Sequence, residues 1–136
     1  METIDREVLE CEVLPDASLW RSAGEVIVTE RQSLVSFLIR LGEIGHRKLH
    51  EKYGYSSLFR YCEQGLRLSR WEAHSRSVVA REGRRYRSVL TFLRAGDLNM
   101  TAAAALAPLL TSDNHESLLK KAKGLSGDQL ERFSPR

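Results

Sequence analysis

The chain has 136 residues, of which 42% are hydrophobic, which is enough for one domain with a buried core. No apolar run approaches the length of a membrane-spanning helix, and the acidic first residues lack the basic and apolar regions of a secretory signal. Two isolated cysteines, Cys11 and Cys62, argue against a disulfide framework or a cysteine zinc site. We therefore expect a reduced, cytoplasmic protein with no membrane association.

The net charge of +3 is unevenly distributed along the chain. Residues 1–30 contain eight acidic and two basic residues, a net charge of −6, whereas the remaining residues carry +9. Apolar residues within 1–28 show no clear period and are interrupted by Pro15, Asp16 and Gly24. We predict an irregular acidic arm over residues 1–28 and a helical domain over 29–133. Trp20 either marks a docking spot for a partner or packs onto the body, which we favour.

The helical domain is predicted to begin at a capping box over residues 29–32, Thr-Glu-Arg-Gln. Apolar residues at spacings of three and four then predict one long helix to about Lys52. Gly42 and Gly45 inside it cost about 1 kcal/mol each relative to alanine, which indicates close approach of another helix. Glu43, His46 and His50 share one face, but no further ligand is near in sequence, so we predict no metal site and no cofactor.

Three helix signals follow between Tyr55 and Arg94. Residues 57–65 show helical apolar spacing, and residues 66–68 form a short connection. Ser69 and Glu72 form a second capping box, which predicts a helix to about Glu82 that stops near Gly83. A third helix is predicted over 84–95, ending at Gly96. Helix, short turn and capped helix together predict a helix-turn-helix.

The last part of the chain is predicted to hold shorter helices. Asn99 is expected to cap a helix over 100–110, which Pro108 shortens. Asp113 and Glu116 resemble a capping box before a helix over 114–122 that ends at Gly124. A final short helix is predicted from Ser126 through Phe133. Because strand signals are nearly absent, the predicted fold is all-α, with six or seven helices.

Arginines concentrate in the predicted helix-turn-helix. Nine lie between Arg60 and Arg94, together with three acidic residues and no lysine. The planar guanidinium suits phosphate oxygens and guanine edges. The predicted partner is double-stranded DNA. We expect side chains at the start of the second helix to contact base edges and the arginines further along to lie nearer the phosphates. The predicted contact residues are Arg70, Trp71, His74, Ser75, Arg76, Arg81, Arg84, Arg85 and Arg87. Two alternatives stay open: Trp71 could pack in the core, and Arg85 or Arg87 could pair with Glu82 or Glu63.

Several motifs resemble the N-terminal helical region of a family of bacterial HNH endonucleases. They are GYSSLF-x-YC, LRLSRWEAHSRSVVAR, FLRAGDLNMTAAAALAPLLT and NHESLLKKAKGLS, in this order over residues 29–133. The segment around Ser69 also resembles, more weakly, the helix-turn-helix of ParB-type partition proteins. The resemblance implies a DNA-binding region of a small transcription regulator, a mobile element or a nuclease-related system. The paired His and Asn of an HNH nuclease module do not occur here, so nuclease activity is not carried over.

The sequence contains no grouping of nucleophile, base and orienting residue, and His74 and His115 are isolated, so we predict no catalytic residues and no enzyme. A second hypothesis is a protein-interaction or assembly module without DNA contact. The acidic arm with Trp20 and the alanine-rich stretch before Pro108 favour it. A homodimer or a separate partner protein are both compatible with this hypothesis.

Overall fold

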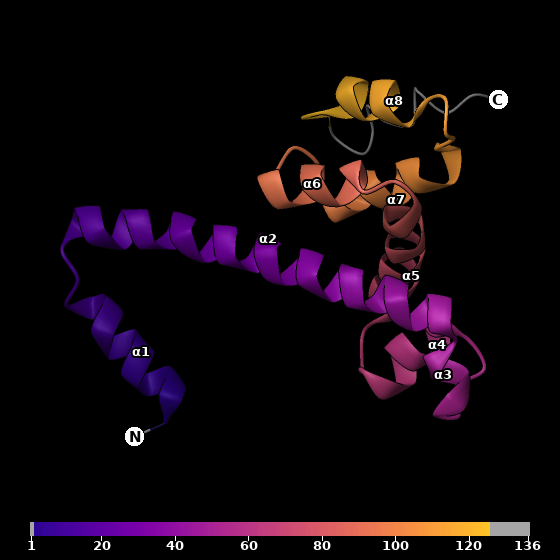
Figure 1. Ribbon diagram of the computed structural model, residues 1–136. Coiled ribbons are helices and arrows are strands. Elements are labelled where there is room, and N and C mark those ends of the chain that lie inside the picture. Colours follow the sequence, from indigo (N-terminus) through magenta and orange to yellow (C-terminus); the bar gives the residue numbers. More distant parts are fainter. Residues whose placement is uncertain (1, 126–136) are drawn as a thin grey trace.

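The computed structural model describes residues 2–125, and this part of the chain is helical without strands (Figure 1). The all-α prediction is confirmed. The helices are α1 (Thr3–Glu12), α2 (Asp16–Arg47), α3 (Leu49–Lys52), α4 (Leu58–Arg60), α5 (Arg70–Arg85), α6 (Ser88–Ala95), α7 (Met100–Leu106) and α8 (His115–Ala122). A π-helical turn, η1 (Tyr61–Gly65), continues α4, and a 3₁₀ turn, η2 (Ala107–Leu109), continues α7.

The irregular arm predicted over residues 1–28 is wrong, because these residues form α1 and the first half of α2. Pro15 separates the two helices, whereas Gly24 does not interrupt α2. The Thr29 hydroxyl donates to the Glu25 carbonyl oxygen at 3.1 Å, so Thr29 lies inside α2 and does not cap a helix. The predicted boundary between residues 28 and 29 therefore falls within a continuous helix.

The two halves of α2 have different surroundings. The second half packs against α5 and α6, whereas the first half and α1 extend away from the other helices (Figure 1). Trp20 is 87% exposed, so its predicted packing onto the body is wrong. At its other end α2 stops at Arg47, because Lys48 takes a left-handed conformation with φ of 55° and starts α3 in a new direction.

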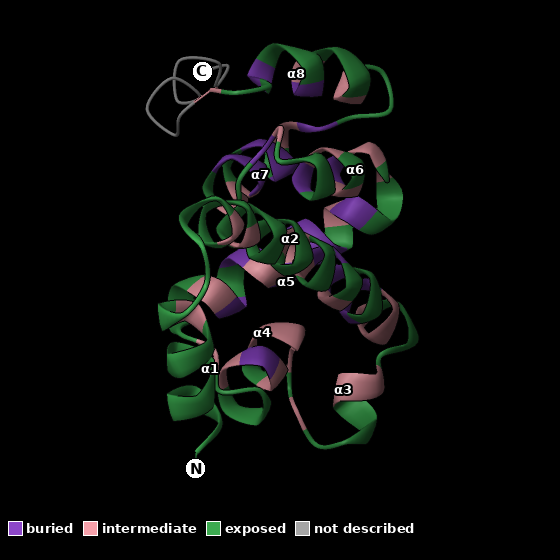
Figure 2. Cartoon of the chain, turned by 90° about the vertical axis from the view of Figure 1, so that its left-hand side faces the viewer, coloured by how far each residue is buried: buried purple, intermediate pink, exposed green. Residues whose placement is uncertain are grey.

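The core lies between the second half of α2 and helices α5 to α8. Its largest fully buried side chains include Leu38 and Leu41 of α2 and Leu106 and Leu119 from the C-terminal helices. Figure 2 shows α1 without buried residues, all but Cys11 being exposed, and the buried residues concentrated in the body. α5 is at the centre and contacts α2, α4, α6 and α7, so it is covered on more than one side.

Several predicted ends of helices are confirmed and others are shifted. Gly96 ends α6 with φ of 83°, and the Asn99 side chain accepts from the Ala102 amide at the start of α7. α5 continues past Gly83 to Arg85, because Gly83 is buried against Leu90.

Further along, α6 begins at Ser88 rather than Arg84, and α7 gives way to η2 at Ala107. The predicted box of Asp113 and Glu116 does not form; Thr111 and Asn114 bond to each other instead. The helix predicted from Ser126 through Phe133 lies outside the described residues.

Candidate nucleic-acid interface

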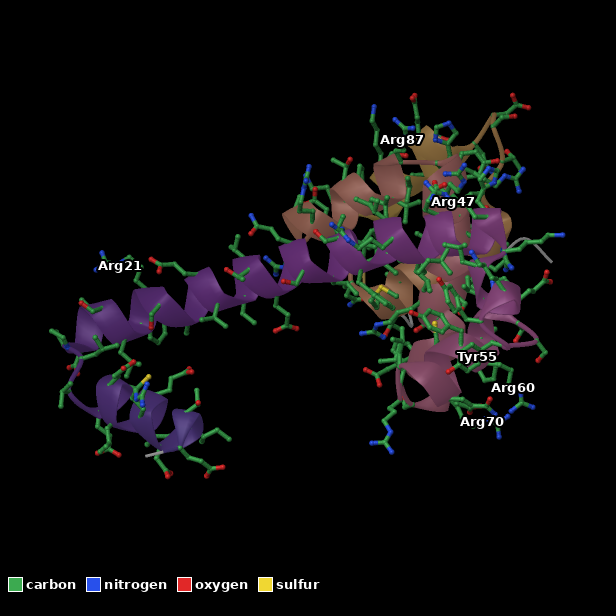
Figure 3. The ribbon with its side chains drawn as sticks, turned by 60° about the horizontal axis from the view of Figure 1, so that its bottom comes forward. Arg21, Arg47, Tyr55, Arg60, Arg70 and Arg87 are labelled. Atoms are coloured by element: carbon green, nitrogen blue, oxygen red, sulfur yellow. The ribbon has the colours of Figure 1, made fainter. Side chains whose placement is uncertain are left out.

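The arginines of the body do not all share one face. Arg60 and Arg70 lie together at one end of the body, and Arg47 and Arg87 lie toward the other end (Figure 3). These two ends correspond to the two ends of α5. With a rise of 1.5 Å per residue, the 16 residues of α5 span about 24 Å. The candidate interface therefore extends along α5 and onto its neighbours.

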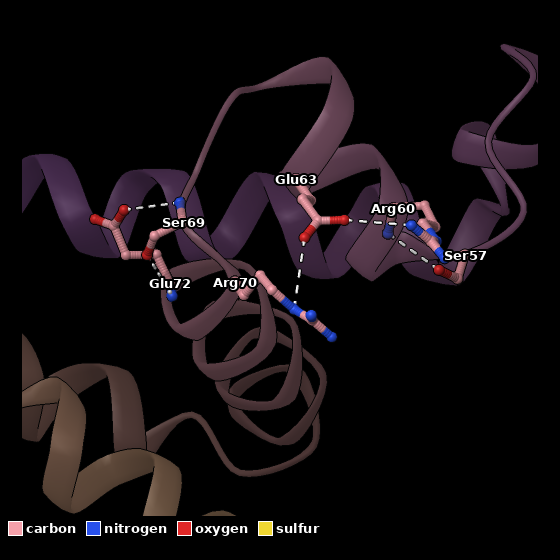
Figure 4. Close-up of polar contacts among 6 residues, drawn as sticks. All are labelled: Ser57, Arg60, Glu63, Ser69, Arg70 and Glu72. Atoms are coloured by element: carbon pink, nitrogen blue, oxygen red, sulfur yellow. Dashed lines mark hydrogen bonds and ion pairs between the residues drawn. The ribbon is translucent and has the colours of Figure 1, made fainter.

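The start of α5 is fixed by the capping box that the sequence predicts. The Ser69 hydroxyl accepts from the Glu72 amide, and the Glu72 carboxylate accepts from the Ser69 amide, each at 3.1 Å (Figure 4). These bonds hold the pKa of Glu72 below its usual value. The connection over residues 66–68 is closed by the Leu68 amide, which donates to the Cys62 carbonyl oxygen at 3.1 Å. This order of elements matches the prediction, while its use as a DNA-binding helix-turn-helix stays a prediction.

One face of α5 has exposed residues at both ends of the helix, whereas none of residues 75–80 is exposed. At 100° per residue, Arg70, Trp71, His74, Arg81 and Arg85 fall within about 100° of one another, and all five are exposed. We call these five residues the α5 stripe. Trp71 is 51% exposed, so it is not a core residue.

Arg70 and Arg85 of the α5 stripe form only long ion pairs with acidic residues. The Arg70 side chain is 87% exposed, with its Nε 3.9 Å from Glu63 Oε2 (Figure 4). Arg85 Nη1 lies 4.0 Å from Glu82 Oε2, as the alternative for Arg85 anticipated.

Ser75 and Arg76 do not belong to this face. The outward position predicted for Ser75 is wrong, whereas the phosphate contact predicted for Arg76 stays a prediction. Ser75 is fully buried, and its hydroxyl donates to the Glu72 carbonyl oxygen at 3.3 Å. The Arg76 side chain is only 19% exposed and lies 3.8 Å from Glu72 Oε2. The reason is that α5 is packed on two sides, whereas the prediction assumed one buried face.

The C-terminal end of α5 opens into a basic groove. Four arginines, Arg81, Arg84, Arg85 and Arg87, line it together with residues from the end of α2, from α3 and from the chain before α4. The lining residues of the facing wall are Gly42, Gly45, His46, His50, Ser56, Ser57 and Leu58. Sequence reasoning placed the four arginines at the interface, but it considered His46 and His50 only as metal ligands.

A second cleft adjoins this groove, between α2, α5 and α6. Apolar residues such as Ile39 and Leu90 line it together with five arginines: Arg40, Arg47, Arg84, Arg87 and Arg94. Sequence reasoning missed Arg40 and Arg47 as site residues. Their spacing of seven residues, two turns of one helix, is the signal that could have found them.

Glu43 is the one carboxylate among the residues that line the two clefts. Its two oxygens lie 2.8 Å from Arg47 Nε and 2.8 Å from Arg84 Nη1. The hydrogen bond from Arg47 is the main cause that holds the pKa of Glu43 below its usual value, with Arg84 adding to it. Glu43 therefore partly neutralises two arginines, while Arg87 forms no ion pair with any residue in the range 2–125.

Residues 2–125 were also compared with the features of a reactive thiol, a metal site and a membrane-spanning helix. Burial raises the pKa of the Cys62 thiol, which keeps it protonated and a poor nucleophile. No cluster of three or more His, Cys, Asp or Glu residues able to hold a metal ion occurs among the described residues. None of the helices in this part of the chain has the length and apolar character to cross a membrane.

Neither a protein-family model, nor a curated protein, nor a solved structure matches this chain at a significant level of similarity.

Proposed function

We propose that this chain is a DNA-binding helical domain that binds duplex DNA along the α5 stripe. The observation that carries the proposal is that five of the nine predicted contact residues are exposed and point to one side of a single helix, three near its start and two near its end. In this arrangement Arg70, Trp71 and His74 at the start of α5 reach base edges. Arg81 and Arg85, with Arg84 and Arg87 beside them, hold phosphates at the other end.

The basic groove supports the second part of this proposal. Arginines from α5 and the following turn face two histidines and two serines across it, and these groups can donate hydrogen bonds to phosphate oxygens. Contact of this kind holds the duplex without reading its sequence. The most fitting biological roles are a small transcription regulator or the DNA-binding part of a mobile-element or nuclease-related system acting in the cytoplasm.

Titration of a fluorescent duplex across a salt series tests the proposal. We expect the logarithm of the association constant to fall linearly with the logarithm of salt concentration, because bound arginines release counterions. The double variant Arg81→Gln, Arg85→Gln should weaken binding and reduce the slope. A matched control, Arg21→Gln with Lys52→Gln, removes the same charge from exposed sites off the stripe. Absence of binding at low salt, or equal loss in the control, would refute the proposal.

A second candidate function is a protein-interaction or assembly module without DNA contact. The exposed apolar side chains of α1 and the first half of α2, with Trp20 the most exposed, favour it. The same titration separates the two functions, because an assembly module leaves the duplex unbound.

A further inference from the structure

The face of α2 that packs in the body continues, uncovered, into the first half of the helix. Leu38, Leu41, Gly42 and Gly45 face the body. Trp20, Ala23, Gly24 and Ile27 each precede one of these residues by 18 positions, which is five helical turns, and so they lie on the same face. The first set is packed against α5 and α4, whereas Trp20 is 87% and Ile27 is 44% exposed.

The two glycines show the contrast most clearly. A Cβ on Gly42 would lie 2.9 Å from the Ala80 carbonyl oxygen, so this glycine permits the close approach of α5. A Cβ on Gly24, on the same face, would meet nothing within 4 Å. Glycine inside a helix costs about 1 kcal/mol relative to alanine, and nothing among residues 2–125 offsets that cost at position 24.

Helix α1 does not cover this face. It lies to one side of α2, where Ile4, Val8 and Cys11 line a depression together with Leu19. Leu19 lies about 100° around the helix from Trp20. The indole of Trp20 therefore remains outside the contact between α1 and α2.

We propose that a second copy of this chain covers the face, with the two α2 helices antiparallel and crossing at Ala23 and Gly24. Around this crossing the face is self-complementary. Trp20 of each copy then lies against Ile27 of the other, and Asp16 of each copy lies against Arg31 of the other. Small residues meet at the centre, large apolar residues flank them, and opposite charges close both ends, which is what a two-fold interface requires.

The charges suit this pairing. Asp16 and Arg31 have no ion-pair partner among residues 2–125, and the Arg31 guanidinium lies beside Gly96 at the end of α6. Trp20 and Ile27 together expose on the order of 300 Å² of apolar surface on this face.

The pairing leaves the α5 stripe uninvolved, so it stands independently of the proposed DNA binding. Its test uses the full chain without nucleic acid. Sedimentation equilibrium should show a dimer for the natural sequence. Trp20→Glu should weaken the dimer at least tenfold while circular dichroism retains the helical signal, since Trp20 does not contact the body. Tyr53→Glu, at an exposed aromatic residue on the other side of the body, should leave the dimer unchanged.

A charge reversal tests the register and separates it from misfolding. Asp16→Arg alone and Arg31→Glu alone should each weaken the homodimer, because each places like charges opposite one another. An equal mixture of the two variants should restore a dimer, since both pairs are then of opposite charge. Three results would overturn the proposal: a monomeric natural chain, a Trp20→Glu dimer of unchanged affinity, or a mixture no tighter than its components. Dimers that persist in every variant would also overturn it, because they would form through another surface.

Discussion

Gly42 of α2 lies so close to Ala80 of α5 that a Cβ at position 42 would be 2.9 Å from the Ala80 carbonyl oxygen. The neighbouring atom belongs to the backbone of a central helix and cannot move aside cheaply. We expect Gly42→Ala to destabilise the fold by about 1–3 kcal/mol through overpacking. Urea unfolding followed by circular dichroism measures this change.

Gly24→Ala is the matched control for that variant. It lies on the same face of the same helix, but it has open space around it, so alanine should stabilise the helix by about 0.5–1 kcal/mol. Measurements at low protein concentration keep the comparison within the monomer. If both variants changed stability with the same sign, close approach of α5 would not be the reason for Gly42.

Substitution at the two ends of α5 should have different effects on DNA binding. Arg87→Ala removes a phosphate contact, so binding should weaken about equally for all sequences and the salt dependence should become less steep. Arg70→Ala removes a base reader, so it should cost roughly 1–3 kcal/mol on a preferred site and change which sequence is preferred. Competition titrations with a pool of duplexes distinguish these outcomes. Equal loss on every duplex would remove Arg70 from the reading role.

Glu43→Gln should strengthen DNA binding. The carboxylate now holds Arg47 and Arg84, each at 2.8 Å, and the neutral amide releases both for phosphate. The gain should be severalfold at low salt and should shrink as salt rises, because exposed charges are screened over about 8–10 Å. Glu116→Gln on α8 changes the same charge on an exposed residue outside both clefts. A comparable gain there would show that only net charge matters.

The capping box makes stability depend on pH in the acid range. Hydrogen bonds from Ser69 hold the pKa of Glu72 below its usual value of 4.5, so the ionised carboxylate stabilises the folded chain above that pH. This contribution is lost as pH falls through the lowered pKa. Thermal unfolding between pH 7 and pH 3 should show a smaller loss of Tm for Glu72→Gln than for the natural sequence. An identical pH profile would place the acid sensitivity at other carboxylates.

The elements that could be predicted from sequence are those fixed by neighbouring residues. Ser69 with Glu72, Asn99 and Gly96 act through bonds or backbone conformations within a few residues, and each begins or ends a helix where predicted. Thr29 carries the same signature as Ser69, yet its hydroxyl bonds backward to Glu25 because the preceding residues are already helical. A four-residue motif does not include the residues before it, so it cannot distinguish a helix start from a position inside a helix.

The errors at the candidate site have a tertiary origin. Ser75 is buried because α5 is enclosed by helices on two sides, and a helical wheel with one buried face places it outside. Arg40 and Arg47 reach the second cleft from α2, which is distant in sequence from the arginine-rich segment. The arm over residues 1–28 is a different kind of error: Pro15, Asp16, Gly24 and apolar residues without a clear period predict a loop, yet Gly24 lies inside α2 without interrupting it.

Because α2 is continuous, a small change in its angle to α5 moves its far end over a larger distance. From its crossing with α5 at Gly42, the helix runs without a break to Trp20, a distance of about 33 Å at 1.5 Å per residue. A tilt of about 10° at the crossing would move Trp20 by about 6 Å, while the core around Leu38 and Leu41 would shift far less. The geometry of one glycine contact thus sets where the far end of the molecule points.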